Sequence, residues 1–176
     1  GKDFIFAHKS ADYKQLAVAI LRGAFEYQGQ KCSAASRAYV PKSLWNDTFA
    51  YIKEMMQTVK MGDVRTFSNF INAVIDEKSF DNIAGYLERA KKSPDAEIVM
   101  GGNCDKSVGY FVEPTIIIAK APKYESIAEE IFGPVITVYV YEDDKYTETL
   151  HLCDETSPYA LTGSILGTDR YALNEA

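Results

Sequence analysis

The sequence predicts an α/β fold, with an open, mostly parallel twisted sheet and helices on both of its faces. Near-continuous apolar runs over residues 110–119 and 135–141 are typical of strands covered on two faces. Segments with helical spacing, roughly 10 to 18 residues long, alternate with such runs, as βαβ units require. Because no repeat, low-complexity tract or linker interrupts this pattern, we expect residues 1–176 to form a single domain or most of one.

Capping and turn residues set the expected boundaries of each element. A buried strand is expected over residues 4–7, followed by a helix that Asp12 caps, that runs through about residue 27 and that Gly29 breaks. The later expected elements are a strand over 37–40 stopped by Pro41, a helix capped by Ser43 and ended by Gly62, an irregular stretch to about 75, a helix over 79–92, a strand over 98–100, strands over 110–119 and 135–141, a helix over 144–155, a strand over 161–166, and a short helix capped by Thr168 or Asp169.

Composition excludes several classes of partner. Lys and Arg number 19 against 25 Asp and Glu, for a net charge of −6. This acidic balance argues against nucleic acid or an anionic membrane surface, since phosphate binding needs clustered basic residues. No apolar run approaches the roughly 20 residues that span a bilayer, so we expect no membrane insertion.

The cysteine and histidine content argues against disulfides and metals. Three cysteines, Cys32, Cys104 and Cys153, are an odd number at irregular spacing, which favours a reducing compartment over a disulfide framework. With two histidines and no CxxC or HExxH pattern, we expect no metal site.

The two ends of the sequence suggest a part of a longer domain. Gly1 is not a methionine, and a buried strand is expected almost at once after it. At the other end, the last helix stops after two turns at most. The alternative is a frayed terminal turn.

Cys32 is the residue that physical chemistry singles out as a candidate nucleophile. It follows a helix-ending glycine and lies among small residues, where a substrate can approach, and Lys31 beside it is a cation that can favour the thiolate. Backbone N–H groups around Cys32 can stabilise an oxyanion on a substrate carbonyl. The alternative is a small buried cysteine that only packs.

Three motifs give this segment a family resemblance. Gly29-Gln30-Lys31-Cys32-Ser33-Ala34, with Phe25 seven positions before the cysteine, resembles the active-site cysteine signature of the aldehyde dehydrogenase superfamily. About a hundred residues later, Glu129-Glu130-Ile131-Phe132-Gly133-Pro134 is similar to the family's cofactor motif. Gly1-Lys2 resembles the end of its Glu-x-Gly-Gly-Lys motif. The order and separation of the three match the family along the whole chain.

The resemblance is strongest to the pyrroline-5-carboxylate dehydrogenase subfamily. The stretches that carry it are residues 25–27, 30–33, 108–114 and 138–146. It implies an enzyme of proline degradation that oxidises glutamate γ-semialdehyde to glutamate with NAD. It also implies a homo-oligomer, in the mitochondrial matrix of a eukaryote or otherwise in the cytoplasm.

Residue roles follow from the resemblance. Cys32 would be the nucleophile that forms a thiohemiacetal and then a thioester. Glu130 would bind the nicotinamide ribose and Phe132 would pack against the nicotinamide. Ser33 and Lys31 would bind the substrate carboxylate, and Phe25 would line the aldehyde pocket. Each has a structural alternative: Glu130 and Lys31 as solvated charges, and Phe25 and Phe132 as core.

The resemblance also implies what these residues lack. The family's general base would precede Gly1, the dinucleotide-binding domain would lie upstream, and the loop for the amino-acid end of the substrate would follow Ala176. We therefore expect the chain alone to be inactive. Two alternatives remain: another aldehyde dehydrogenase acting on a carboxylated semialdehyde, and a non-catalytic α/β module for assembly.

Overall fold

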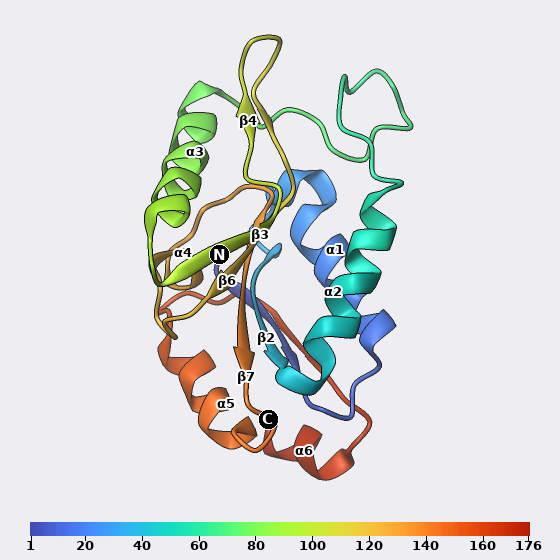
Figure 1. Cartoon of the computed structure of the whole chain (residues 1–176), viewed down its shortest axis with the longest axis vertical. Coiled ribbons are helices and arrows are strands. Elements are labelled where there is room, and N and C mark those ends of the chain that lie inside the picture. Colours follow the sequence, from blue (N-terminus) through green and yellow to red (C-terminus); the bar gives the residue numbers. More distant parts are fainter.

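A computed structural model describes all residues, 1–176, and contains a mixed six-stranded sheet flanked by helices (Figure 1). No helix is both long and apolar enough to cross a membrane. The elements in chain order are β1 (Asp3–Ala7), α1 (Tyr13–Phe25), the 3₁₀ turn η1 (Glu26–Gly29), β2 (Ala35–Pro41), α2 (Lys42–Met56), α3 (Glu77–Lys92), β3 (Ala96–Met100), β4 (Cys104–Asp105), β5 (Phe111–Val112), β6 (Thr115–Ala119), α4 (Glu125–Ala128), β7 (Val135–Tyr141), α5 (Tyr146–Glu155), β8 (Gly163–Leu166) and α6 (Arg170–Glu175).

The order of strands in the main sheet is β3-β6-β7-β2-β1-β8. Every neighbouring pair is parallel except β3 and β6, which are antiparallel. The mostly parallel sheet is therefore confirmed. The strands β7, β2 and β1 lie side by side in its centre, so the segments that lead into them start from one edge of the sheet.

Helices cover both faces of the sheet, as predicted. On one face α1 and α2 bury a core that includes Ile5, Ala38 and Val138. On the other face α3 packs on Ile117, while α5 and α6 pack around an aromatic group centred on Phe6. In Figure 1, α1 and α2 lie to the right of the sheet and α3 and α5 to the left. Successive residues along each strand point to opposite faces of the sheet, and both faces are covered by helices. Both sets of residues are therefore apolar, which explains the continuous apolar runs.

The expected strand over residues 110–119 is wrong as one element. The structure divides it into β5, which pairs with β4, and β6, which joins the main sheet. Pro114 lies between them and has no N–H to donate to a ladder. Thr115 then donates its hydroxyl hydrogen to the carbonyl oxygen of Glu113, which closes the turn.

The ends of α2 also differ from the prediction. Ser43 does not cap it; instead, the backbone N–H of Ser43 donates to Oδ1 of Asp143, 100 residues away, at 3.0 Å. The helix ends at Met56, six residues before Gly62, and an irregular segment follows. The cap therefore comes from the acidic turn after β7 rather than from the helix's own sequence.

Three other boundaries were predicted more closely. Asp12 caps α1 by accepting from Gln15 N–H at 2.8 Å, and Asp169 caps α6. Strand β8 is two residues shorter than expected, because the N–H groups of Leu161 and Thr162 donate to the side chain of Asp3 instead of extending the strand.

Candidate active site

Cys32 lies in an exposed turn between η1 and β2. The turn begins where Tyr27 and Gln28 adopt left-handed backbone angles, with φ of 55° and 57°, and end the regular helix at Phe25. These two residues explain why the helix is shorter than its apolar spacing predicts.

Two glutamine side chains anchor the segment before Cys32. Oε1 of Gln28 accepts from the N–H of Asn72 at 3.0 Å, and Oε1 of Gln30 accepts from the N–H of Ile75 at 2.8 Å. Both glutamines therefore tie the cysteine turn to the irregular segment between α2 and α3. Their role was missed in the sequence, because a glutamine that bonds a distant backbone has no local signature.

Glu130 and Phe132 lie on a second turn, between α4 and β7. The Glu130 side chain is 45% exposed, and Phe132 is 43% exposed with a left-handed φ of 59°. An aromatic residue in this region of backbone space is strained, which is more common at functional sites than elsewhere. Neither residue lies in the core, so both side chains are available to a ligand.

The fold brings these two turns together. Gly29, with φ of 64°, packs directly on the carbonyl oxygen of Gly133. Gly1 also packs on the cysteine turn, because a β-carbon there would overlap the carbonyl oxygen of Cys32. The contact arises because β1, β2 and β7 are adjacent and parallel, so the residues that precede them meet at one edge.

The predicted substrate residues have different surroundings. Lys31 donates to Oε2 of Glu26 at 2.8 Å, and Arg22 donates to the other oxygen of that carboxylate. Hydrogen bonds from Lys31 and then Arg22 lower the pKa of Glu26. The Lys31 ammonium is thus partly neutralised beside the cysteine.

Ser33 and Phe25 differ in burial: Ser33 is exposed and Phe25 is buried. Ser33 is exposed and lines a small cavity of about 160 Å³ together with Asp3 and Thr162. Phe25 has no exposed surface and belongs to the core beneath α1. Its position matches the packing alternative, and contact with an aldehyde stays a prediction.

The other two cysteines differ from Cys32 in their environment. Burial raises the pKa of the half-buried Cys104 thiol, and burial raises that of Cys153 to about 11. Cys153 is 4% exposed. Only Cys32 among the three is exposed, which suits a nucleophile.

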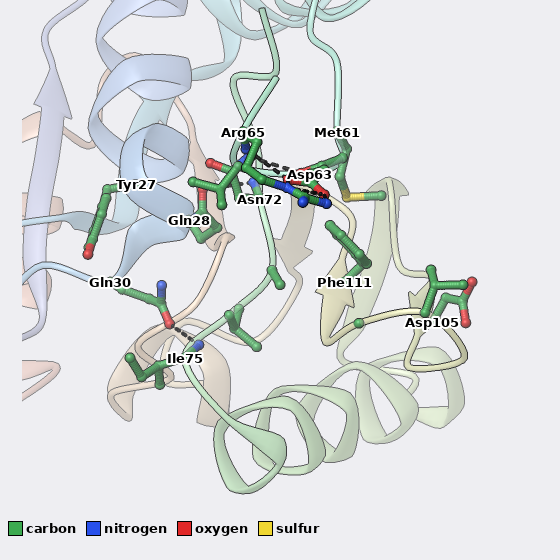
Figure 2. A pocket seen from close by; sticks show the side chains of 16 residues that line it. Tyr27, Gln28, Gln30, Met61, Asp63, Arg65, Asn72, Ile75, Asp105 and Phe111 are labelled. Carbon is green, nitrogen blue, oxygen red and sulfur yellow. Dashed lines mark hydrogen bonds and ion pairs between the residues drawn. The ribbon is translucent and has the colours of Figure 1, made fainter. Parts of the chain in front are cut away.

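A large cavity lies next to the cysteine turn (Figure 2). It has a volume of about 940 Å³ and is lined by Tyr27, Gln28 and Gln30, by the segment after α2 and by the hairpin of β4 and β5. Neither Cys32 nor Glu130 lines it. Gln30 contributes to the wall through the same side chain that holds Ile75 (Figure 2).

No group of three or more His, Cys, Asp or Glu side chains is placed to hold a metal ion. The charges near the cysteine turn are instead paired with one another, as Lys31 and Glu26 show.

Comparison with known proteins places these features in context. The profile of the family described as "Aldehyde dehydrogenase family" matches residues 1–176. The mitochondrial delta-1-pyrroline-5-carboxylate dehydrogenase of Dictyostelium discoideum is 61% identical over 176 residues, and the human protein of that name is 51% identical over 177. The chain spans 32% of the Dictyostelium protein and 31% of the human one.

Solved structures agree with the sequence comparison. The delta-pyrroline-5-carboxylate dehydrogenase of Mycobacterium tuberculosis matches with a TM-score of 0.93 and 41% identity, over 99% of this chain and 32% of that one. A structure of the same enzyme bound with NAD matches with a TM-score of 0.90 and 40% identity, over 99% of this chain and 31% of that one.

Proposed function

The chain belongs to the aldehyde dehydrogenase family, and from that membership we propose that it supplies the cysteine part of an NAD-dependent active site that oxidises glutamate γ-semialdehyde to glutamate. The observation that carries the proposal is the backbone contact of Gly29 with Gly133, which places the Cys32 turn against the Glu130 turn. It joins an exposed thiol to an exposed carboxylate about a hundred residues away in sequence. The names of the relatives support the substrate.

Cys32 is the proposed nucleophile. Its sulfur adds to the aldehyde carbon and forms a thiohemiacetal, whose oxidation leaves a thioester on Cys32. Water then adds to the thioester carbon, releasing the carboxylic acid and restoring the thiol. The backbone N–H of Cys32 is a proposed donor to the oxyanion, an interaction worth roughly 3 kcal/mol of the barrier.

Glu130 and Phe132 are the proposed cofactor residues, and their exposure fits that role. A carboxylate that is nearly half exposed can accept hydrogen bonds from ribose hydroxyls, and an aromatic face on a turn can pack against a flat ring. NAD, when bound, supplies the hydride acceptor for the oxidation. The NAD-bound Mycobacterium structure supports NAD as the cofactor.

Ser33 and Lys31 are the proposed residues for the substrate carboxylate. Both lie next to Cys32, Ser33 is exposed, and Lys31 carries a charge that a dicarboxylic product requires nearby. In this role Lys31 exchanges its contact with Glu26 for one with the substrate. Phe25 lies in the core beneath the turn and supports it, and contact with the aldehyde remains its proposed second role.

The 176 residues alone are proposed to be inactive. They form most of a catalytic domain, span about a third of the relatives and include no dinucleotide-binding motif. A protein of the relatives' full length is proposed to act as a homo-oligomer, in the mitochondrial matrix of a eukaryote or otherwise in the cytoplasm; the word "mitochondrial" in the relatives' names supports the mitochondrion. Appreciable NAD reduction by the isolated chain with the semialdehyde contradicts this part of the proposal.

A hybrid enzyme tests the function. The chain replaces the matching segment of the Dictyostelium relative, which aligns with all of it. We expect the hybrid to reduce NAD with glutamate γ-semialdehyde, and Cys32→Ser to lower kcat by at least about a thousandfold. Cys104→Ser is the matched control and should leave the rate near that of the hybrid. An active Cys32→Ser hybrid contradicts the proposal.

The same hybrid separates the alternatives. If the chain belongs to an enzyme for another carboxylated semialdehyde, succinate semialdehyde should be turned over with the higher kcat/KM. If it is a non-catalytic assembly module, the hybrid should form the oligomer of the relative and lack activity.

A further inference from the structure

We propose that Lys2 is a positioning residue that holds the Glu130 turn against the cysteine turn. This inference rests on the proposed function, because it concerns the placement of Glu130, the proposed cofactor-binding carboxylate. The contacts that carry it come from the structure alone.

Lys2 is a lysine with no exposed surface. Its Nζ donates to the carbonyl oxygen of Ser126 in α4 at 2.6 Å, and its own carbonyl oxygen accepts from Nε of Arg37 in β2 at 2.9 Å. Lys2 therefore joins the start of β1 to the short helix that leads into Glu130. Only three residues separate Ser126 from Glu130.

The partners of Lys2 are themselves fixed in the interior. The hydroxyl groups of Ser126 and Thr137 share a buried hydrogen bond of 2.8 Å, which attaches α4 to β7. Arg37 is 2% exposed and also donates to the carbonyl oxygen of Cys153 at 2.7 Å, which attaches β2 to α5. The helix α4, which leads into the Glu130 turn, is thus held by a continuous network of buried hydrogen bonds, and Lys2 connects this network to the start of β1.

Two charged groups face the Lys2 ammonium. Arg37 approaches from β2, and Glu129 approaches from the turn after α4, where its carboxylate accepts from the hydroxyl of Tyr86 at 2.5 Å. The pKa of Lys2 is lowered to about 7. Burial is the largest cause, the positive charge of Arg37 acts in the same direction, and the negative charge of Glu129 opposes both. The amine consequently changes charge near neutral pH, unlike a surface lysine.

The charge state of Lys2 acts directly on the Glu130 turn. A protonated Lys2 attracts Glu129 and donates a charge-assisted bond to Ser126, whereas a neutral amine does so more weakly. We expect the position of residues 129–133 to follow this titration. A lysine that served only to fill space would leave the turn unchanged.

Nuclear magnetic resonance of the chain tests the proposal. The chain is N-acetylated, which removes the positive charge from Gly1. We expect the Cε resonance of Lys2 and the amide resonances of residues 129–133 to shift with one shared midpoint near pH 7. In Lys2→Met the amide shifts should lose this titration, while strand β2 keeps its native resonances. Lys120→Met, an exposed lysine paired with Glu97, is the matched control and should retain it.

Two results overturn the proposal: amides of residues 129–133 that do not follow the Lys2 midpoint, or a folded Lys2→Met chain in which they still titrate. If Lys2→Met does not fold, the shared midpoint in the unsubstituted chain decides. These readouts need no turnover, so they stand apart from the hybrid enzyme assay: an inactive hybrid with a coupled turn refutes the function and leaves the role of Lys2 intact.

Discussion

Gly29 packs its α-carbon on the carbonyl oxygen of Gly133, so the turn that carries Cys32 and the turn that carries Glu130 touch backbone to backbone. The two glycines are 104 positions apart in sequence. A β-carbon on Gly29 would overlap that oxygen and lie 2.7 Å from the carbonyl oxygen of Ala24. No side chain separates the two turns, so small changes in either backbone reach the other.

Gly29→Ala tests this contact through stability. The left-handed φ of 64° and the overlap with backbone atoms should together lower the free energy of unfolding by roughly 3 kcal/mol or more, measured by denaturant titration. Gly85→Ala in α3 is the matched control, because its nearest neighbour is the flexible side chain of Arg89 and alanine favours a helix. Equal stability of the two variants would show that the turns do not pack as described.

Thiol labelling tests the exposure of Cys32. With iodoacetamide at pH 7.5, we expect Cys32 to react at least about tenfold faster than Cys104 and Cys153, because burial raises the pKa of both other thiols. Peptide mass spectrometry assigns the sites. In denaturant the three rates should converge. Faster labelling of Cys153 than of Cys32 in the folded chain would contradict the placement of Cys32 in an open turn.

Glu130→Gln in the hybrid enzyme tests the cofactor assignment. Loss of a charge-assisted hydrogen bond to the ribose should raise the KM for NAD by about 10- to 100-fold. Glu113→Gln is a control on a carboxylate whose partner is Asn103, on the β4–β5 side of the molecule, and should leave KM unchanged. The assignment fails if Glu130→Gln and Glu113→Gln give the same KM as the unsubstituted hybrid.

The pH dependence of stability tests the burial of Lys2. Its folded pKa of about 7 lies below the ordinary value of 10.5, so between these values the unfolded chain binds a proton that the folded chain has lost. Stability contributed through this group therefore rises with pH above 7, by up to about 1.4 kcal/mol per pH unit. Above pH 9 Cys153 opposes the trend, because its raised pKa keeps a proton on the folded chain.

The window from pH 7 to 8.5 isolates this contribution. The difference in free energy of unfolding between the unsubstituted chain and Lys2→Met should rise with pH across it, measured by urea titration. A difference that stays constant with pH would mean that Lys2 titrates normally in the folded chain.

Asp143→Ala tests the cap that reaches α2 from the turn after β7. Loss of the bond to the Ser43 N–H should lower stability by about 1 kcal/mol. Asp144→Ala is the matched control, since Asp144 is exposed and makes no such bond. Ser43→Ala should also have little effect, because the Ser43 hydroxyl does not cap the helix. A larger loss of stability for Ser43→Ala than for Asp143→Ala would mean that the Ser43 side chain is the cap after all.

Much of the fold was predictable because its signals are local. The alternation of apolar runs with helical stripes gave the parallel sheet and its covered faces, and Asp12 and Asp169 marked helix starts by bonding to the next turn. Boundaries failed where a distant group decided them. Asp143 caps α2, and Asp3 takes the N–H groups that would have extended β8.

The candidate site followed the same division. Cys32 and Glu130 could be selected by motif, and the structure brings their turns into contact through Gly29 and Gly133. The pairing of Lys31 with Glu26, the anchoring by Gln28 and Gln30, and the burial of Lys2 had no signature in the sequence. Each depends on a partner that only the folded chain places within hydrogen-bonding distance.

The sequence by itself determined the residue types and their spacing: a cysteine among small residues, a carboxylate before Ile131, and apolar strands that need cover on both faces. Only the tertiary structure decided that the segments before β1, β2 and β7 share one edge, because that depends on which strands become neighbours in the sheet. The pattern of buried residues in a helix or strand can be inferred from a few neighbouring residues in the sequence. Which strands become neighbours in a sheet depends on the closing of long loops, and local sequence patterns do not encode that choice.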